Sequence, residues 1–154
     1  MEKALFKLDE FCGQNKIEYM VTGTVALSLL GVPSCDIPRD IDIIVFHAND
    51  EQLKKLSELE FLGGYKKGCY PESECYTFAI EGVKVNAIID RKSDYGDIAL
   101  QSVCLCMVDE ATYKHRHINV QKINYALSAK MKLNRDKDKS YTLDLIHSLT
   151  HLGQ

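Results

Sequence analysis

Residues 41–46 constrain the fold more than any other part of this 154-residue chain. Their sequence is IDIIVF, in which Asp42 is the only polar residue. An apolar run this continuous predicts a strand in the middle of a sheet, where both of its faces are covered. Because Asp40 and Asp42 are two residues apart, a strand that holds both projects their carboxylates from the same face. Two carboxylates so close repel each other, and something must compensate their charge.

The rest of the chain predicts an α+β fold around this strand. Helical spacing of apolar residues predicts helices at 2–16, 25–30, about 50–60, 121–134 and 137–152. Strands are predicted at 17–21, 65–69, 75–80 and 83–89, with a tight turn at Glu81-Gly82. The segment between 90 and 120 is less regular. We expect one domain over 1–154 with a mixed sheet flanked by helices, a core at 17–92 and a C-terminal helical pair at about 119–152.

Composition excludes several classes of protein. A hydrophobic fraction of 45% fits one compact domain, and a net charge of −3 provides no long-range field that attracts nucleic acid. The sequence shows neither the pattern of a signal peptide nor an apolar run long enough to span a bilayer. We therefore expect a cytoplasmic protein with no membrane partner and with its six cysteines as reduced thiols.

A divalent cation would resolve the repulsion between Asp40 and Asp42. Mg²⁺ prefers hard oxygen ligands and takes its remaining ligands from water and substrate phosphates. Two such ions about 3.5–4 Å apart can hold both the attacking and the leaving oxygen of a phosphoryl displacement. The structural alternative is that Asp40 caps the entrance of the strand and Asp42 pairs with Arg39 or Lys84. For an isolated Asp-x-Asp tripeptide this alternative is the more common one.

A Gly-Thr pair, Gly23-Thr24, precedes the acids at a predicted strand-to-helix turn. A glycine lets the backbone approach a phosphate, and the amides at the start of a helix attract anions. The Thr24 hydroxyl can donate to a phosphate oxygen. Taken alone, the pair indicates a turn with a helix cap. Its position one helix before an acidic strand favours a phosphate site.

A cluster of basic residues lies between the two predicted C-terminal helices. Its members are Lys130, Lys132, Arg135, Lys137 and Lys139. Charged runs of this kind usually form a solvated surface. Here Asn134 and Asp136 interrupt the helical pattern, so the charges are expected at a junction between helices rather than along one of them.

These motifs, in this order, resemble those of the nucleotidyltransferase superfamily. The residues that carry the resemblance are VTGT at 21–24, a following helix, and DIDI at 40–43. The superfamily includes DNA polymerase beta, antibiotic nucleotidyltransferases and minimal nucleotidyltransferases of toxin–antitoxin systems. The chain is most similar to small bacterial abortive-infection-type nucleotidyltransferases, whose Lys-x4-Arg-x-Lys-Asp motif is matched by Lys130, Arg135, Lys137 and Asp138. The resemblance extends from 17 to about 149 and implies the nucleotidyltransferase fold.

The resemblance also implies roles for individual residues. The nucleotide-binding residues that it implies are Gly23, Thr24, Lys130, Arg135 and Lys137. Arg39 is a further candidate, because it lies beside the acids. Asp40 and Asp42 are the expected ligands of Mg²⁺ or Mn²⁺, and with Asn86 they form the candidate catalytic group.

Two features depart from the pattern of the superfamily. The position of the usual third carboxylate holds Asn86. An amide oxygen can ligate a cation, but the amide is neutral and cannot take a proton. Relatives also often carry an Arg four residues before the first Asp and a Thr two residues before it, where this chain has Asp36 and Pro38.

Three hypotheses of function follow. The first is an enzyme that transfers a nucleoside monophosphate from an NTP to a hydroxyl of a protein, a tRNA or a small molecule, with Mg²⁺ bound. The second is a catalytically degenerate member of the fold that acts as a nucleotide-binding or toxin–antitoxin partner protein, which Asn86 favours. The third is an interaction protein without a nucleotide site, which requires every motif match to be coincidental. The first hypothesis accounts for most of the motifs.

Overall fold

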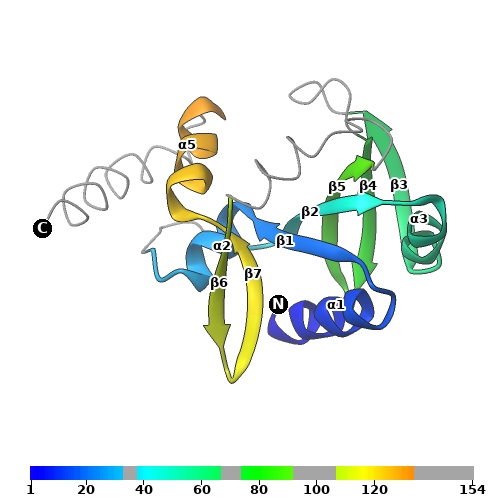
Figure 1. Ribbon diagram of the computed structural model, residues 1–154, viewed down its shortest axis with the longest axis horizontal. Helices are drawn as coiled ribbons and strands as arrows, with labels where there is room; N and C mark the ends of the chain where they lie inside the picture. The colour runs from blue at the N-terminus through cyan, green and yellow to red at the C-terminus, as the bar shows by residue number, and fades with distance from the viewer. Residues whose placement is uncertain (33–37, 67–73, 92–106, 134–154) are drawn as a thin grey trace, which may run out of the picture.

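The computed structural model describes residues 1–32, 38–66, 74–91 and 107–133, which form a seven-stranded mixed sheet and four helices (Figure 1). The strand order is β3-β4-β5-β2-β1-β7-β6. The strands are β1 (Glu18–Thr22), β2 (Ile41–Ala48), β3 (Glu60–Lys66), β4 (Glu74–Ile80), β5 (Val83–Arg91), β6 (Val108–Tyr113) and β7 (Arg116–Gln121). The helices are α1 (Glu2–Gln14), α2 (Gly23–Leu29), α3 (Asp50–Ser57) and α5 (Ile123–Leu133). The predicted α+β class is confirmed.

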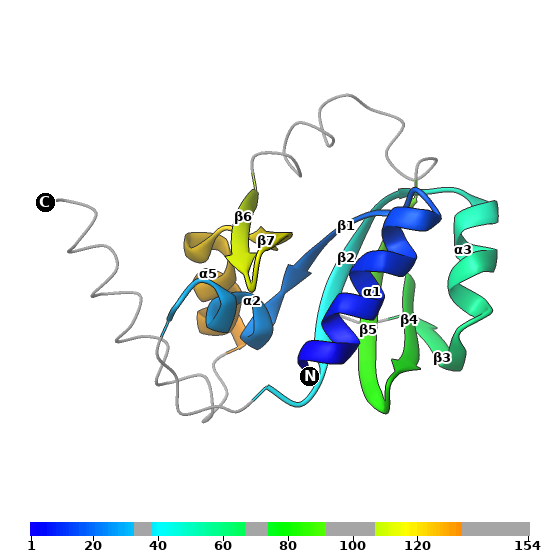
Figure 2. The ribbon, with the colours of Figure 1, turned by 90° about the horizontal axis from the view of Figure 1, so that it is seen from below.

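Strand β2 lies inside the sheet, as its apolar sequence predicts. It pairs in parallel with β5 and antiparallel with β1. Ile41, Ile43 and Val45 are completely buried in the main core, which also contains residues of α1 and α3. Figure 2 shows both helices on the same side of the sheet. Because side chains alternate along a strand, Asp42 projects from the opposite side.

A second, smaller core joins α2 to α5. Leu27 and Val32 pack there with Ala126 and Leu127. The two helices lie side by side at the end of the sheet that carries β6 and β7 (Figures 1 and 2). This packing brings residues near 24 close to residues near 130.

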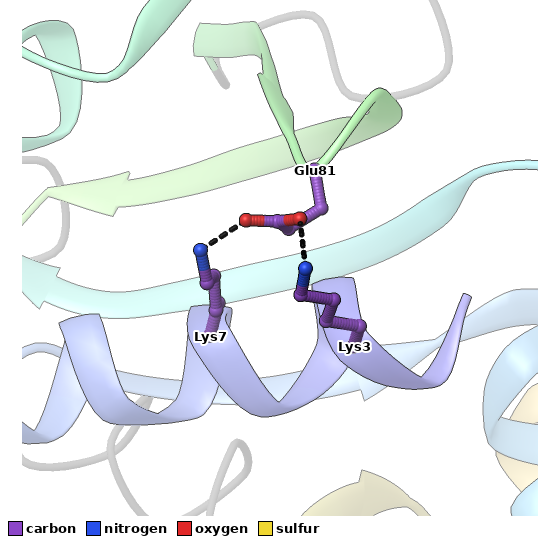
Figure 3. A network of polar contacts seen from close by, with 3 residues as sticks. All are labelled: Lys3, Lys7 and Glu81. Atoms are coloured by element: carbon purple, nitrogen blue, oxygen red, sulfur yellow. Dashed lines mark hydrogen bonds and ion pairs between the residues drawn. The ribbon is translucent and has the colours of Figure 1, made fainter.

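The turn between β4 and β5 forms as predicted. Glu81 and Gly82 both have positive φ values, +52° and +73°, as expected for a two-residue hairpin turn. Glu81 accepts ion-pair contacts from Lys3 and Lys7 of α1, so it ties the turn to this helix (Figure 3). The hydrogen bonds from Lys7 and Lys3 lower the pKa of the Glu81 carboxyl.

The prediction for residues 50–69 is partly wrong. A capping box between Asn49 and Gln52 starts α3 where expected, but the helix ends at Ser57 and β3 already begins at Glu60. Pairing with β4, which matches Glu60 to Ala79, outweighs the helical pattern of the preceding residues. Residues 67–69 of the predicted strand lie outside the described part of the chain.

The segment without a regular pattern contains a hairpin, formed by β6 and β7. Its turn residues Lys114 and His115 have φ values of +45° and +68°. Hairpin turns of this geometry usually contain Gly or Asn, so this sequence lacked the usual signal. The predicted helix at 137–152 lies outside the described residues. None of the helices in the described ranges is long and apolar enough to cross a membrane.

Candidate functional site

Four polar residues lie in register across four neighbouring strands, on the face opposite α1. They are Thr22 of β1, Asp42 of β2, Asn86 of β5 and Thr77 of β4. The Asn86 amide nitrogen Nδ2 donates to Asp42 Oδ1 at 3.0 Å. The hydroxyl of Thr77 donates to Asn86 Oδ1 at 3.2 Å. A chain of hydrogen bonds therefore fixes the orientation of the Asp42 carboxylate.

The sequence patterns pointed to no role for Thr77, although the sequence contains a signal for its position. The predicted turn at Glu81-Gly82 pairs Ile80 with Val83, and counting back along the hairpin pairs Thr77 with Asn86. The position of Asn86 beside Asp42 could not be found in this way. It depends on parallel pairing between β2 and β5, which are separated by two further strands in the sequence.

The second oxygen of Asp42 lies against Gly23. A Cβ atom built on Gly23 would come within 2.9 Å of Asp42 Oδ2, and the φ of this glycine is +66°. Glycine is therefore required both by the left-handed backbone and by the close approach of a carboxylate. The Gly-Thr turn and the Asp-x-Asp motif, which are separate in the sequence, meet at this contact.

Asp40 lies in a bend just before β2, not in the strand itself. Its Oδ2 atom is 3.2 Å from Lys84 Nζ, and the two side chains are 38% and 47% exposed. Ion pairs this exposed contribute about 0–1 kcal/mol, so a divalent cation can displace the lysine. The alternative to a metal site predicted that Asp42 pairs with Arg39 or Lys84. In the structure Lys84 pairs with Asp40, Asp42 accepts from Asn86, and Arg39 is exposed.

Lys130 lies beside the Gly-Thr turn. Its Nζ donates to Thr24 Oγ1 at 2.9 Å, and only 6% of the residue is exposed. A charged amine is rarely buried to this extent unless it is paired, because removing it from water is costly. The packing of α2 on α5 holds this ammonium near the contact between Gly23 and Asp42. A positive charge and a hydroxyl at one point suit an anion such as a phosphate.

The donor atoms fit a hard divalent cation. Asp40 and Asp42 supply carboxylate oxygens, and Gly23, which has no Cβ, lets Asp42 Oδ2 lie close to the turn. Asn86 turns its NH₂ group toward Asp42 and so presents a donor there rather than a ligating oxygen. In the described part of the chain, no group of three or more His, Cys, Asp or Glu side chains could by itself hold a metal ion. Arg135 and Lys137 lie outside that part.

Comparison with known proteins identifies similar folds at low sequence identity. No protein-family model matches the chain, and no curated protein matches it in sequence. A provisionally assigned nucleotidyltransferase from Thermotoga maritima is 21% identical and has a TM-score of 0.58, with 94% of this chain and 91% of that one covered. The lincosamide antibiotic adenylyltransferase LnuA, solved with lincomycin, is 17% identical with a TM-score of 0.60, and 94% of each chain is covered.

A third structure has the same arrangement in a longer chain. The antigenic nucleotidyltransferase-like protein of Paracoccidioides brasiliensis is 13% identical and has a TM-score of 0.52. The match covers 90% of this chain and 70% of that protein. At such identities the three likenesses establish the fold, and the chemistry must be argued from the residues of this chain.

Proposed function

We propose that this chain, which has the nucleotidyltransferase fold, transfers a nucleoside monophosphate from an NTP to a hydroxyl group of an acceptor. One observation carries the proposal: the contact between Gly23 and Asp42 lies next to the hydrogen bond between Thr24 and Lys130. Three distant parts of the sequence thus bring a glycine turn, a carboxylate and a buried ammonium to one place. A nucleoside triphosphate with its cation needs groups of these three kinds.

Each group has a role in this proposal. The Thr24 hydroxyl and the Lys130 ammonium bind phosphate oxygens, and Asp40 and Asp42 hold Mg²⁺ or Mn²⁺. When bound, the cation neutralises phosphate charge and aligns the reacting groups. Positioning and charge stabilisation supply most of the catalysis in phosphoryl-type transfer. Arg39, Arg135 and Lys137 are further predicted nucleotide contacts.

At the α-phosphorus the reaction forms one bond and breaks one, and the acceptor hydroxyl loses its proton. The acceptor oxygen bonds to the α-phosphorus, the bond from this phosphorus to pyrophosphate breaks, and pyrophosphate leaves. Asn86 cannot take the proton of the acceptor hydroxyl, because an amide is not a base at neutral pH. The proton then passes to water, and we expect slow transfer.

The acceptor is a protein, a tRNA or a small molecule. LnuA shares the fold, and its name describes adenylyl transfer connected with a lincosamide antibiotic. ATP is therefore the first nucleotide to test, and small hydroxylated molecules are the first acceptors. The narrower assignment to the abortive-infection type depends on the Lys-x4-Arg-x-Lys-Asp motif, of which only Lys130 lies in the described part of the chain.

A second candidate function is nucleotide binding without transfer, in a toxin–antitoxin partner for example. The hydrogen bond from Asn86 to Asp42 favours it, because a neutral donor stands where a third carboxylate would act. In that case the Asn86→Asp variant should transfer label from an α-labelled NTP and the wild type should not. Transfer by the wild type would exclude this candidate.

Calorimetric titration tests the nucleotide site itself. ATP, GTP, CTP and UTP are titrated, with and without Mg²⁺, into the wild type and the Asp40→Ala/Asp42→Ala double variant. The control is Asp109→Ala/Glu110→Ala, which removes two exposed acids from β6. We expect Mg²⁺-dependent binding that only the first double variant loses. A folded wild type that binds none of the four nucleotides would refute the proposal.

A further inference from the structure

Strand β5 directs two donor groups at the two acids. Lys84 and Asn86 are two residues apart and project from the same face, next to Asp40 and Asp42. Lys84 Nζ is 3.2 Å from Asp40 Oδ2, and Asn86 Nδ2 donates to Asp42 Oδ1 at 3.0 Å. Each carboxylate therefore has one oxygen engaged by a group of the same strand.

The carboxylate of Asp42 determines which end of the Asn86 amide faces it, because an ionised carboxylate only accepts hydrogen bonds. The amide nitrogen is therefore turned toward Asp42, and the Thr77 hydroxyl donates to Asn86 Oδ1 on the other side. For Asn86 to ligate a cation beside Asp42, the amide would have to turn over. The hydrogen bond to Asp42 would break, the Thr77 hydroxyl would change from donor to acceptor, and the amide oxygen would then face the carboxylate oxygen. The contact with Asp42 thus opposes the use of Asn86 as a metal ligand.

The charges of these four side chains, counted apart from Lys130 and the nucleotide, bear on how many cations the protein itself can compensate. Asp40 and Asp42 contribute two negative charges, Lys84 contributes one positive charge and Asn86 contributes none, so the four side chains sum to −1. Two divalent ions held about 3.5–4 Å apart repel each other strongly and need several carboxylates to compensate their charge. An Asp at position 86 would make the sum −2 and would offer a further oxygen ligand.

We propose that β5 makes this a single-cation site. One divalent ion binds at Asp40 and Asp42 together with the nucleotide, and the Lys84 ammonium, displaced from Asp40 but still on the same face of β5, supplies positive charge in place of a second ion. Asn86 and Thr77 are positioning residues that hold Asp42 in its orientation. The inference rests on the proposed function, because the cation arrives with a nucleoside triphosphate.

Electron paramagnetic resonance of Mn²⁺ tests this count directly. The full chain is kept in excess over a non-hydrolysable ATP analogue, and Mn²⁺ is added up to three equivalents of the analogue. Two Mn²⁺ ions in one site couple magnetically, whereas a lone ion gives an uncoupled spectrum. We expect one bound Mn²⁺ per analogue and no coupling in the wild type. In Asn86→Asp we expect two bound ions and a coupled spectrum.

Two further variants sharpen the test. Asn124→Asp makes the same chemical change at an exposed position of α5 and should keep one uncoupled ion. Lys84→Met removes the ammonium that competes with the cation for Asp40. Mn²⁺ should then bind about threefold to fivefold more tightly, because that factor corresponds to the loss of an exposed ion pair.

The possible outcomes separate this inference from the proposed function. A coupled pair of ions in the wild type would overturn the single-cation inference and leave the proposed nucleotide site intact. A single bound ion in Asn86→Asp would show that position 86 does not determine the number of bound cations. This result would also overturn the single-cation inference. A folded wild type that does not bind the analogue would refute the proposed function and, with it, this inference. If Asn86→Asp does not fold, the number of Mn²⁺ ions bound by the wild type decides between one cation and two.

Discussion

Lys130 Nζ donates a hydrogen bond to Thr24 Oγ1 at 2.9 Å, and so links two residues that are 106 positions apart in the sequence. The lysine is almost completely buried, in contrast to most lysines of folded proteins. Its carbon stem reaches the turn because α5 packs on α2 through Leu27 and Leu127. The packing of the two helices thus holds a buried ammonium beside the glycine turn.

The first prediction concerns this ammonium. Lys130→Met keeps most of the length of the side chain and removes its charge. We expect the affinity for ATP to fall by about 10-fold to 100-fold, which corresponds to the loss of a charge-assisted hydrogen bond. The free energy of unfolding should change little, because an apolar residue avoids the cost of burying a charge. Calorimetry and urea denaturation measure the two effects. The exposed Lys122→Met is the control, and equal affinities for the two variants would contradict the prediction.

The second prediction separates backbone strain from contact at Gly23. Gly23 and Gly31 both have left-handed φ values, but only at Gly23 does a Cβ meet another atom within 4 Å. Gly31→Ala should therefore lower the free energy of unfolding by about 1–2 kcal/mol through strain alone.

Gly23→Ala should also turn the carboxylate of Asp42 away from its hydrogen bond with Asn86. We expect a larger loss of stability than in Gly31→Ala, together with loss of Mg²⁺-dependent nucleotide binding. Urea denaturation and calorimetry on both variants check this. Nucleotide binding by Gly23→Ala at wild-type affinity would show that the contact with Asp42 does not shape the site.

The third prediction concerns charge beside Asp42. Asn86→Asp replaces a hydrogen-bond donor by a second carboxylate, which should lower the free energy of unfolding by about 1–3 kcal/mol in a chelator. A divalent cation should restore much of this loss, because it binds the folded state preferentially. Urea denaturation in EDTA and in Mn²⁺ measures the difference, with Asn124→Asp as the control. An equal loss in both solutions would show that no cation binds between residues 42 and 86.

The fourth prediction concerns high pH. Burial raises the pKa of the Cys12 thiol to about 12, and burial together with the hydrogen bond to Asp9 raises the pKa of the Tyr19 hydroxyl. Both groups stay protonated in the folded chain at a pH at which the unfolded chain releases their protons. Their contribution to stability is therefore intact below about pH 9 and decreases as the pH rises toward 12.

Urea denaturation under reducing conditions between pH 7 and 11 checks this decrease. The double variant Cys12→Ala/Tyr19→Phe lacks both titrating groups, so its free energy of unfolding should depend less steeply on pH above 9. Each variant is compared with its own value at pH 7, which removes the effect of altered packing. If the free energy of unfolding depends on pH in the same way in the wild type and the double variant, Cys12 and Tyr19 do not cause the decrease.

Local signals predicted those parts of the fold that neighbouring residues determine. The start of the helix near residue 50, the turn at Glu81-Gly82 and the central strand 41–46 were all found from short stretches of sequence. The β6–β7 hairpin was missed, because its turn places Lys114 and His115 in a conformation that other residues adopt more readily. The start of β3 was missed because it depends on pairing with β4, not on its own sequence.

The same division applies to the candidate site. The sequence by itself determined that Asp42 would lie in a buried strand with Asp40 two residues before it, and that a glycine turn would precede both. The spacing of residues in a strand or a turn is a local property. Only the tertiary structure decided that Asn86 and Lys84 engage the acids and that Lys130 reaches Thr24. These contacts depend on the pairing of β2 with β5 and on the packing of α2 with α5. Such pairings join distant segments, and no short stretch of sequence encodes them.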